Sequence, residues 1–388
     1  MVATDLPRGF RVFRLAVLYN HPSTYWGPRG LLRSPPVKHF RLLLSSAFIA
    51  VTLAGLAVRL SQPARAASVS GSDSRSFEFT YQVHFPATPG AAGASRLWLP
   101  APSRHVVHQT PPVNLIVLGD VKNATGHDSE YGNEFVVFTP TPEQAAAGFD
   151  AGIRFSVTRE EYAVLRNGAA VQETAAGFAP PPLLDRYLQP DKLVPLNGVI
   201  ADLARHQTAG ATTPLEKARK IYDYVVSTMH YDHAGEGWGR GDAVWACDSK
   251  HGNCTDFHSV FIGMMRAAGI PARFEIGFQI PTGKSEGEIS GYHCWSEFYV
   301  SGIGWIPIDA SEASQHTEKK DYFFGALDPN RVLFTYGRDI RLSSDQKGDP
   351  LNYFIYPYAE AGGQSVKNLE RHFSFRDLSV SSQGTTAR

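Results

Sequence analysis

The sequence is poor in charged residues and in cysteine. Asp, Glu, Lys and Arg make up only 19% of the 388 residues, and the 37 basic residues equal the 37 acidic ones, so the formal net charge is zero. Without an excess of positive charge, nothing in the composition indicates binding to nucleic acid or to an anionic membrane surface. Three cysteines cannot form a disulfide framework, and their odd number leaves at least one thiol free.

The abundant residues indicate a globular, strand-rich protein. Hydrophobic residues make up 43% of the chain, which argues against a disordered polypeptide, and the 35 Gly and 26 Pro residues favour strands and loops over a helical bundle. A chain of 388 residues is too long for one ordinary core. We therefore expect two domains with additional segments.

The N-terminal region has the three-part layout of a secretory signal. A basic segment at Val37–Arg41 precedes an apolar run from 42 to 58, and Pro63–Ala67 contains an A-x-A site with cleavage after Ala66. This pattern predicts an exported protein, periplasmic or extracellular. The alternative is an uncleaved anchor, because the apolar run is about long enough to cross a bilayer. Membrane association would then depend on this segment alone.

Residues 1–36 are rich in Arg and Pro and fit no part of that layout. One hypothesis is that translation starts near Val37. Residues 1–66 are accordingly interpreted as an N-terminal extension and signal peptide that precede the folded domains.

Short runs that alternate between hydrophobic and polar residues follow the signal, as is typical of β-strands. The runs are Phe77–Phe85, Arg96–Leu99, Val113–Val117, Phe135–Phe138 and Ile153–Val157. Their spacing predicts a β-sandwich-like domain over residues 67–178. Ala179–Pro182 is interpreted as a linker, residues 179–345 as a catalytic core, and residues 346–388 as a C-terminal strand or tail.

Helices and strands are both predicted in the core. Thr213–Glu216 has the pattern of a capping box, and the apolar face behind it predicts a helix to about Met229. Asn253 is a good N-cap for a second helix over Cys254–Ala268. The Gly-rich stretch Gly235–Gly252 is expected to form a loop. Strand patterns follow at Phe274–Ile280, His293–Val300 and Trp305–Asp309.

Cys254 lies in the first turn of its predicted helix, where the helix dipole and free N–H groups stabilise a thiolate. His293 begins one strand and Asp309 ends the next. A His that takes the thiol proton and is oriented by a carboxylate is the minimum arrangement for acyl transfer through cysteine. A symmetric hairpin places Asp309 opposite Ser296 instead, so the pairing needs an offset register or a bulge. The plainer alternative is a buried, inert cysteine.

Three blocks of the sequence resemble the transglutaminase core. They are Gly252–Phe257 followed by Gly269–Arg273, then Tyr292–Tyr299, then Gly304–Asp309. The family patterns are roughly G-x-C-x-D-[FY] with G-I-P-[AS]-R, then H-[AC]-W-x-E-x-[YF], then G-W-x-x-x-D. The blocks occur in the family's order, over roughly residues 185–345. The resemblance implies a papain-like α+β fold, with a nucleophile helix packed on an antiparallel sheet and Cys254, His293 and Asp309 as the catalytic triad.

The resemblance also bears on the residues around the cysteine. Related enzymes use an aromatic residue upstream of the cysteine as an oxyanion donor, so Trp245 and Tyr231 are candidates for that role beside the Cys254 N–H. Asp256 is interpreted as structural and is expected to hold a neighbouring loop. Arg273 is likewise interpreted as structural and is expected to pair with a carboxylate.

A metal site is the competing interpretation of the cysteines. A C-x3-H-x2-C-x3-H pattern, which suits zinc, is formed by Cys247, His251, Cys254 and His258. It leaves the other two blocks unexplained, so we expect no metal and no other cofactor. Cys294 is expected to point away from His293 into the core. A Cys247–Cys294 disulfide stays open as a second possibility.

Together these features predict a cysteine enzyme that transfers acyl groups from peptide or isopeptide amides through a thioester. If the acceptor is water, the enzyme is a protease or amidase, and if it is a lysine-type amine, the enzyme is a transglutaminase. A protein or peptide substrate is the expected partner. The alternative is a non-catalytic binding protein with a decayed transglutaminase-like fold, against which the intact Cys, His and Asp set argues.

Overall fold

The computed structural model describes residues 73–378, apart from 91–92, 105, 107, 167–168 and 171–180. The predicted N-terminal extension and signal peptide lie outside the described residues. Within the described ranges, no helix is long and apolar enough to cross a membrane.

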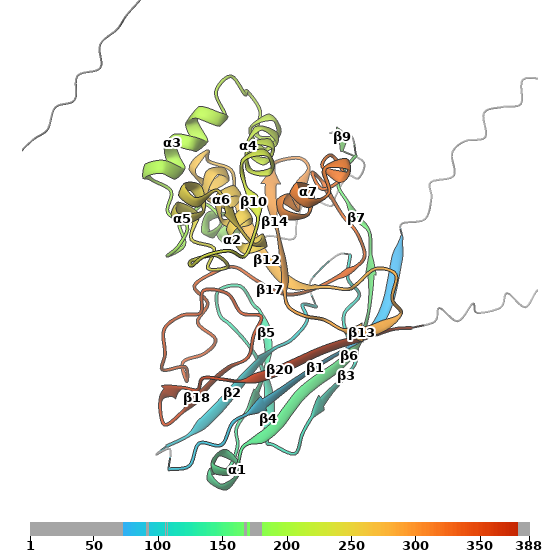
Figure 1. Ribbon diagram of the computed structural model, residues 1–388, viewed down its shortest axis with the longest axis vertical. Coiled ribbons are helices and arrows are strands. Elements are labelled where there is room, and N and C mark those ends of the chain that lie inside the picture. Colours follow the sequence, from blue (N-terminus) through green and yellow to red (C-terminus); the bar gives the residue numbers. More distant parts are fainter. Residues whose placement is uncertain are drawn as a thin grey trace, which may run out of the picture. The chain divides into compact units, whose positions relative to one another are not determined.

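Two five-stranded sheets form the β-rich part of the described chain (Figure 1). The first sheet has the order β13-β20-β1-β6-β3, with β1 (Ser74–Phe85), β3 (Val113–Leu118), β6 (Phe149–Glu160), β13 (Glu286–Glu288) and β20 (Glu370–Asp377). The second has the order β19-β18-β2-β5-β4, with β2 (Ser95–Pro100), β4 (Asn123–His127), β5 (Glu134–Phe138), β18 (Tyr358–Ala361) and β19 (Gln364–Ser365). Buried residues of both sheets belong to one hydrophobic core, as in a sandwich.

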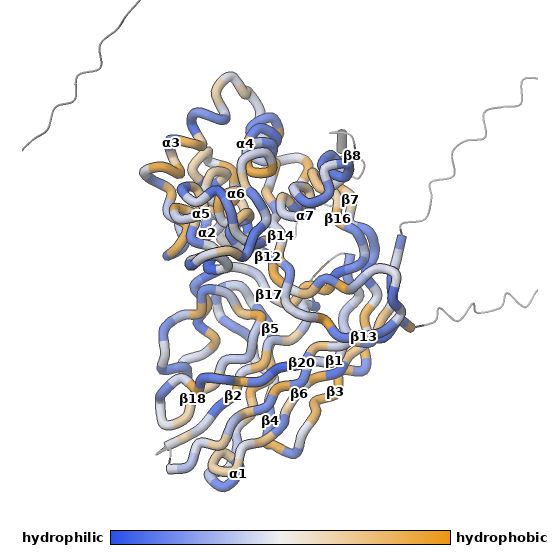
Figure 2. Tube along the Cα trace, viewed as in Figure 1, coloured by the Kyte–Doolittle hydropathy of each residue, from blue (hydrophilic) through white to orange (hydrophobic). Residues whose placement is uncertain are grey.

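The alternating sequence pattern accounts for the central strands. Phe77, Phe79 and Tyr81 on β1 are all fully buried, whereas the residues between them are partly exposed. Figure 2 shows the matching change of hydropathy along β1 and β6. The edge strand β3 differs, because Val113 is 56% and Ile116 is 44% exposed. The pattern therefore predicted the presence of β3 but not its exposure, since an edge strand packs against one neighbour only.

The predicted papain-like core is confirmed. An antiparallel sheet of order β15-β14-β12-β17 carries β12 (Ala272–Gln279), β14 (His293–Val300), β15 (Gly304–Ile308) and β17 (Arg331–Tyr336). Helix α6 (Cys254–Ala267) packs on β12 and β14. Around α6 lie α3 (Gly198–Gln207), α4 (Pro214–Thr228), α5 (Ala243–Ser249) and α7 (Ala310–Gln315) (Figure 1).

The C-terminal segment returns to the two β-sheets. Strand β20 pairs antiparallel with β1, Phe77 opposite Asp377, and β18 pairs with β2. The aromatic core is continuous between the sheets and the catalytic core, since Phe79 lies 5.1 Å from Phe278 and 5.6 Å from Phe334, measured between ring centroids. The division of the chain at residues 178 and 345 stays a prediction.

The short elements complete the described fold. They are α1 (Pro142–Ala147), α2 (Pro181–Arg186), the 3-10 turn Thr317–Lys319, and the pairs β7 (Tyr162–Ala163) with β16 (Ala326–Leu327), β8 (Leu165–Arg166) with β9 (Ala169–Ala170), and β10 (His230–Tyr231) with β11 (His251–Gly252). Two expectations were wrong in part. Helix α2 begins inside the proposed linker, and α5 interrupts the stretch expected to be a loop, because Asp242 caps it through the N–H groups of Val244 and Trp245.

Candidate active site

The nucleophile candidate lies where the sequence predicted, at the first position of α6. The Asn253 side chain accepts a hydrogen bond from the Thr255 N–H at 2.9 Å and so caps the helix. At Gly252, φ is +150°, and a Cβ there would lie 2.3 Å from the Asp256 carboxylate, so only glycine fits before the cap. Cys254 is 1% exposed. None of the hydrogen bonds within the described chain uses the Cys254 N–H, which leaves it free to face an oxyanion.

His293 and Asp309 meet despite the register of their hairpin. Strands β14 and β15 pair Ser296 with Ile308, so Asp309 is level with Trp295, two residues from His293. Asp309 does not continue the strand, because it is the N-cap of α7, with φ −132° and ψ 89°. This change of direction brings its Oδ2 to 2.7 Å from His293 Nε2. The offset that the sequence required is thus supplied by a one-residue shift of the hairpin register together with a strand-to-helix turn.

The Asp309 carboxylate is held by several donors. Its Oδ1 accepts hydrogen bonds from the Ser311 hydroxyl at 2.9 Å and the Glu312 N–H at 3.0 Å. Its Oδ2 accepts from Arg331 Nη1 at 3.1 Å as well as from His293. Burial would raise the Asp309 pKa, but the His293 charge and hydrogen bond and the Arg331 charge outweigh it and lower the pKa. Asp309 is therefore an ionised carboxylate that only accepts hydrogen bonds.

Cys254 interacts electrostatically with His293, the imidazole whose Nε2 faces Asp309. Burial would raise the Cys254 pKa, yet interactions with Cys294 and with His293 and its charge lower it to about 6. Burial would lower the His293 pKa, but Asp309 and the Cys254 thiolate raise it to about 10. At neutral pH the pair is thus a thiolate and an imidazolium.

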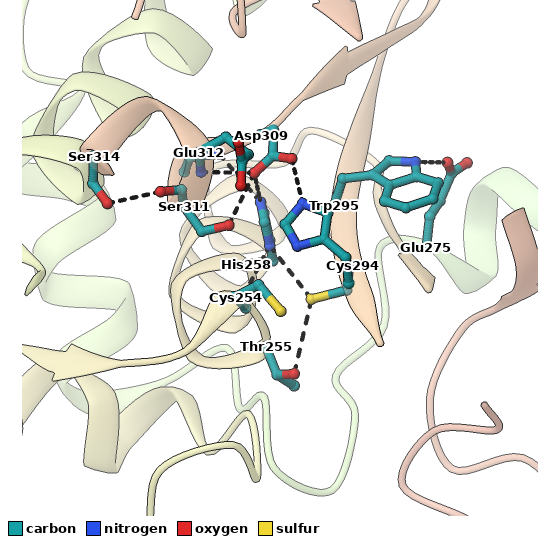
Figure 3. Close-up of polar contacts among 12 residues, drawn as sticks. Cys254, Thr255, His258, Glu275, Cys294, Trp295, Asp309, Ser311, Glu312 and Ser314 are labelled. Carbon is teal, nitrogen blue, oxygen red and sulfur yellow. Dashed lines mark hydrogen bonds and ion pairs between the residues drawn. The ribbon is translucent and has the colours of Figure 1, made fainter. Parts of the chain in front are cut away.

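Cys294 lies beside the nucleophile, which the sequence did not predict. It is fully buried as expected, and its Sγ lies 3.8 Å from Thr255 Oγ1 and 3.6 Å from His258 Nδ1. Figure 3 shows the sulfur atoms of Cys254 and Cys294 turned toward each other. Burial and the neighbouring thiolate raise the Cys294 pKa, so it stays a neutral S–H donor. Strand alternation alone gave no signal for this contact, because it depends on how α6 crosses β14.

His258 is a neutral bridge between two helices. Its Nδ1 lies 2.7 Å from the Cys254 carbonyl oxygen and so donates to it, and its Nε2 accepts from the Ala310 N–H at 3.2 Å. Burial lowers the His258 pKa to about 4, although the Asp309 charge opposes this. With both ring nitrogens engaged, His258 joins the start of α6 to the start of α7.

The structural interpretations of Asp256 and Arg273 are confirmed. The buried Asp256 carboxylate accepts three backbone N–H groups, from Gly239 at 2.6 Å, Gly241 at 2.9 Å and Asn253 at 2.9 Å. It therefore ties the glycine-rich loop to the start of α6. Arg273 is hydrogen-bonded to the Glu297 carboxylate, as expected for a structural arginine.

The two oxyanion candidates occupy different places. Tyr231 is half-buried and pairs with Gly252, two residues before Cys254. Burial and the Cys254 charge raise its pKa, so its hydroxyl stays protonated. Trp245 packs against Gly237, where a Cβ would lie 2.7 Å from its Nε1, and its ring lies 5.2 Å from that of His251. Tyr231 is thus the candidate that the structure brings toward Cys254.

The competing zinc ligands do not converge. Among the described residues, no group of three or more His, Cys, Asp and Glu side chains is arranged to hold a metal ion. The three cysteines are free thiols, so the Cys247–Cys294 disulfide is not formed. Burial raises the Cys247 pKa to about 11, in contrast to Cys254.

Comparison with known proteins gives matches at the level of sequence and of fold. An uncharacterized protein of Haemophilus influenzae is 27% identical over 337 residues, which cover 77% of this chain and 89% of that protein. Protein YebA of Bacillus subtilis is 27% identical over 143 residues, covering 33% of this chain but only 19% of YebA. The crystal structure of a candidate cysteine protease from Cytophaga hutchinsonii superposes with a TM-score of 0.54 at 15% identity, covering 79% of this chain and 92% of that one.

A family model covers the segment that holds the site. Residues 201–310 match the model of the transglutaminase-like superfamily, and this range includes α6, β14 and the turn at Asp309. The three sequence blocks that suggested the family all overlap it. Residues 201–310 are thus similar to the transglutaminase-like superfamily, as the three blocks suggested.

Proposed function

We propose that the protein is a cysteine-dependent acyltransferase that acts on peptide or isopeptide amides through a thioester intermediate. One observation carries the proposal: Cys254 lies at the capped N-terminus of α6, where His293 lowers its pKa, and His293 Nε2 lies 2.7 Å from Asp309. The superfamily match and the cysteine-protease-like fold support cysteine-based catalysis in general.

The first half-reaction forms the thioester. The Cys254 thiolate attacks the amide carbonyl carbon, and the carbonyl oxygen becomes an oxyanion. The Cys254 N–H faces this charge as the first donor, and the Tyr231 hydroxyl is the proposed second donor. When the tetrahedral intermediate collapses, the C–N bond breaks and the departing amine takes the proton from His293.

The second half-reaction resolves the thioester. Water or a primary amine gives its proton to the neutral His293, attacks the thioester carbon and releases the Cys254 thiolate, so that the starting ion pair returns. Asp309 remains a carboxylate throughout and orients the imidazole. Water as the acceptor makes the protein a protease or amidase, and a lysine-type amine makes it a transglutaminase.

Export is part of the proposal and rests on the sequence of residues 37–66. We place the mature protein in the periplasm or outside the cell, with protein or peptide substrates and with Ala67 as its first residue. Sequencing the N-terminus of the native protein tests this. A peptide from residues 1–30 would instead show that the upstream stretch is translated and retained.

The function is tested by a screen of peptide amides with and without a fluorescent primary amine. Wild-type protein and a Cys247→Ala variant should release the amine leaving group at equal rates, because Cys247 is a buried thiol outside the site. Cys254→Ala and His293→Ala should both be inactive. Amine-linked product identifies transamidation, and free acid identifies hydrolysis. Turnover that survives in Cys254→Ala would contradict the proposal, and a folded wild type inactive on every peptide would favour the binding-protein alternative.

A further inference from the structure

Arg331 lies behind Asp309 and outside every block that resembles the family. It is the first residue of β17, fully buried, and its guanidinium joins two carboxylates. Nη1 donates to Asp309 Oδ2 at 3.1 Å, and Nη2 donates to Asp328 Oδ2 at 2.6 Å. The guanidinium carbon also lies 5.0 Å from the centre of the Trp295 ring, on the strand that carries His293. The planar guanidinium is therefore held in one orientation by Asp309, Asp328 and Trp295, which lie in three different segments.

Arg331 places a positive charge beside a group of residues that otherwise carries an excess of negative charge. The Cys254 thiolate and Asp309 are negative, and the His293 imidazolium is positive, so these three residues alone leave one uncompensated negative charge. All three are buried, and an uncompensated buried charge is strongly unfavourable. His258 is neutral and contributes no charge. Arg331 supplies a compensating positive charge next to Asp309, whereas Asp328, its second carboxylate partner, is partly exposed to solvent.

We propose that Arg331 is a positioning residue for the catalytic triad: it fixes Asp309 against His293, and its charge keeps the thiolate–imidazolium pair populated at neutral pH. This inference rests on the proposed function of Cys254. Arg331 touches neither the sulfur nor a substrate, and it acts through Asp309. Lysine does not replace it, because one ammonium group lacks the planar fork that spans Asp309 and Asp328.

Other titratable groups also face the triad. They are His258 on α6, Cys294 on β14, Tyr231 on β10, Tyr222 on α4 and Glu312 on α7. The two tyrosines and Cys294 stay neutral at neutral pH, because burial raises the pKa of each. Arg331 is thus the cation in direct contact with Asp309 besides His293, among the described residues.

The test is the rate of Cys254 alkylation by iodoacetamide as a function of pH, followed by mass spectrometry of the Cys254 peptide. The assay needs no substrate. The acid limb is the pH range in which the alkylation rate rises as the Cys254 thiolate forms. Removing the positive charge behind Asp309 should move this limb upward by about one pH unit or less. Arg331→Gln should therefore lose most of its alkylation at pH values where wild type still reacts.

In a second variant the acid limb should move in the opposite direction. Asp328→Asn removes a negative charge on the far side of Arg331 and leaves the Arg331–Asp309 contact in place, so the acid limb should move downward. The movement should be smaller, about half a pH unit or less, because Asp328 is farther away and partly exposed. Arg266→Gln is the matched control, since it removes another buried guanidinium that pairs with a carboxylate, Asp191, at 2.7 Å. The pH dependence of Cys254 alkylation in this variant should match that of the wild type.

The outcomes separate the inference from the function on which it rests. If folded Arg331→Gln shows the same pH dependence of Cys254 alkylation as the wild type, the proposed role of Arg331 is overturned while the thiolate chemistry stays intact. If Arg331→Gln does not fold, an unmoved limb in Asp328→Asn overturns it instead. Wild-type Cys254 that reacts no faster than an ordinary thiol at pH 7 would remove the proposed function itself.

Discussion

The hydrogen bonds of Asp256 give a sharp prediction about how the site is held. Asp256 is fully buried, and its carboxylate accepts three backbone N–H groups, two from the loop at Gly239 and Gly241 and one from Asn253. Asp256→Asn keeps the size of the side chain but turns one oxygen into an NH2 group. That group meets backbone donors and cannot accept from them.

The expected loss follows from these three contacts. A hydrogen bond to a charged group contributes about 1.5–3 kcal/mol, and a neutral one about 0.5–1.5 kcal/mol. Losing one bond and weakening two would cost up to about 5 kcal/mol. Part of this is offset, because burial raises the Asp256 pKa, which shows that the carboxylate is itself costly to desolvate. We expect a net loss of about 3 kcal/mol, which lowers Tm by about 5 °C for a unit of roughly 300 residues.

Limited proteolysis with trypsin reports on the loop directly. Arg240 lies exposed between the two tethered glycines, and its carbonyl oxygen accepts from Arg338 at 3.1 Å and from Asn352 at 2.7 Å. If the 3 kcal/mol is lost from local opening, cleavage after Arg240 should accelerate by up to about 100-fold. The increase should appear at this bond before others.

Asp232→Asn is the matched control for this variant. Asp232 is an exposed aspartate near the same loop, and it accepts from the Ala234 N–H at 2.9 Å. Its Tm should change by no more than about 1 °C, as for most surface substitutions. If Asp256→Asn behaves like Asp232→Asn in both Tm and cleavage, Asp256 does not hold the loop and the reasoning fails.

Three further predictions concern the reacting groups. The pH dependence of activity should be bell-shaped, rising through about pH 6 as the Cys254 thiolate forms and falling through about pH 10 as His293 loses its proton. Initial rates between pH 5 and 11 check this. A rise or fall centred near pH 8.5 would contradict it. Asp309→Asn should lower kcat by about 10²–10⁴-fold, because a neutral amide does not stabilise the imidazolium; a loss below about tenfold in folded protein speaks against the triad. Cys294→Ala should raise the acid limb by about one pH unit or less, since the backbone N–H of Cys294 remains as a donor, and alkylation profiles would reveal an unmoved limb.

Local patterns were sufficient to predict the elements that carry the site. The strand His293–Val300 and the helix from Cys254 have the bounds expected from the sequence to within one residue, because alternation and an Asn cap are local signals. Helix α5 was not predicted, because it has only seven residues and the glycines around it indicate a loop.

The family resemblance predicted that His293 and Asp309 meet, but local patterns did not show how the chain makes its long-range contacts. Asp309 reaches His293 by leaving its strand to cap α7, which no hairpin rule anticipates. Arg331 follows Asp309 by 22 positions and meets it because β17 pairs with β12 in the same sheet as β14. Cys294 contacts Thr255 and His258 in the first turns of α6 because this helix packs on β14.

The central claim is that Cys254 forms the thioester. It is tested most directly by mixing the protein with an activated acyl ester, quenching in acid within milliseconds and measuring the mass of the intact protein and of its Cys254 peptide. The account predicts one added acyl group on Cys254 in the wild type and in Cys247→Ala, and none in Cys254→Ala. An acyl group on another residue, or unchanged acylation in Cys254→Ala, would contradict it.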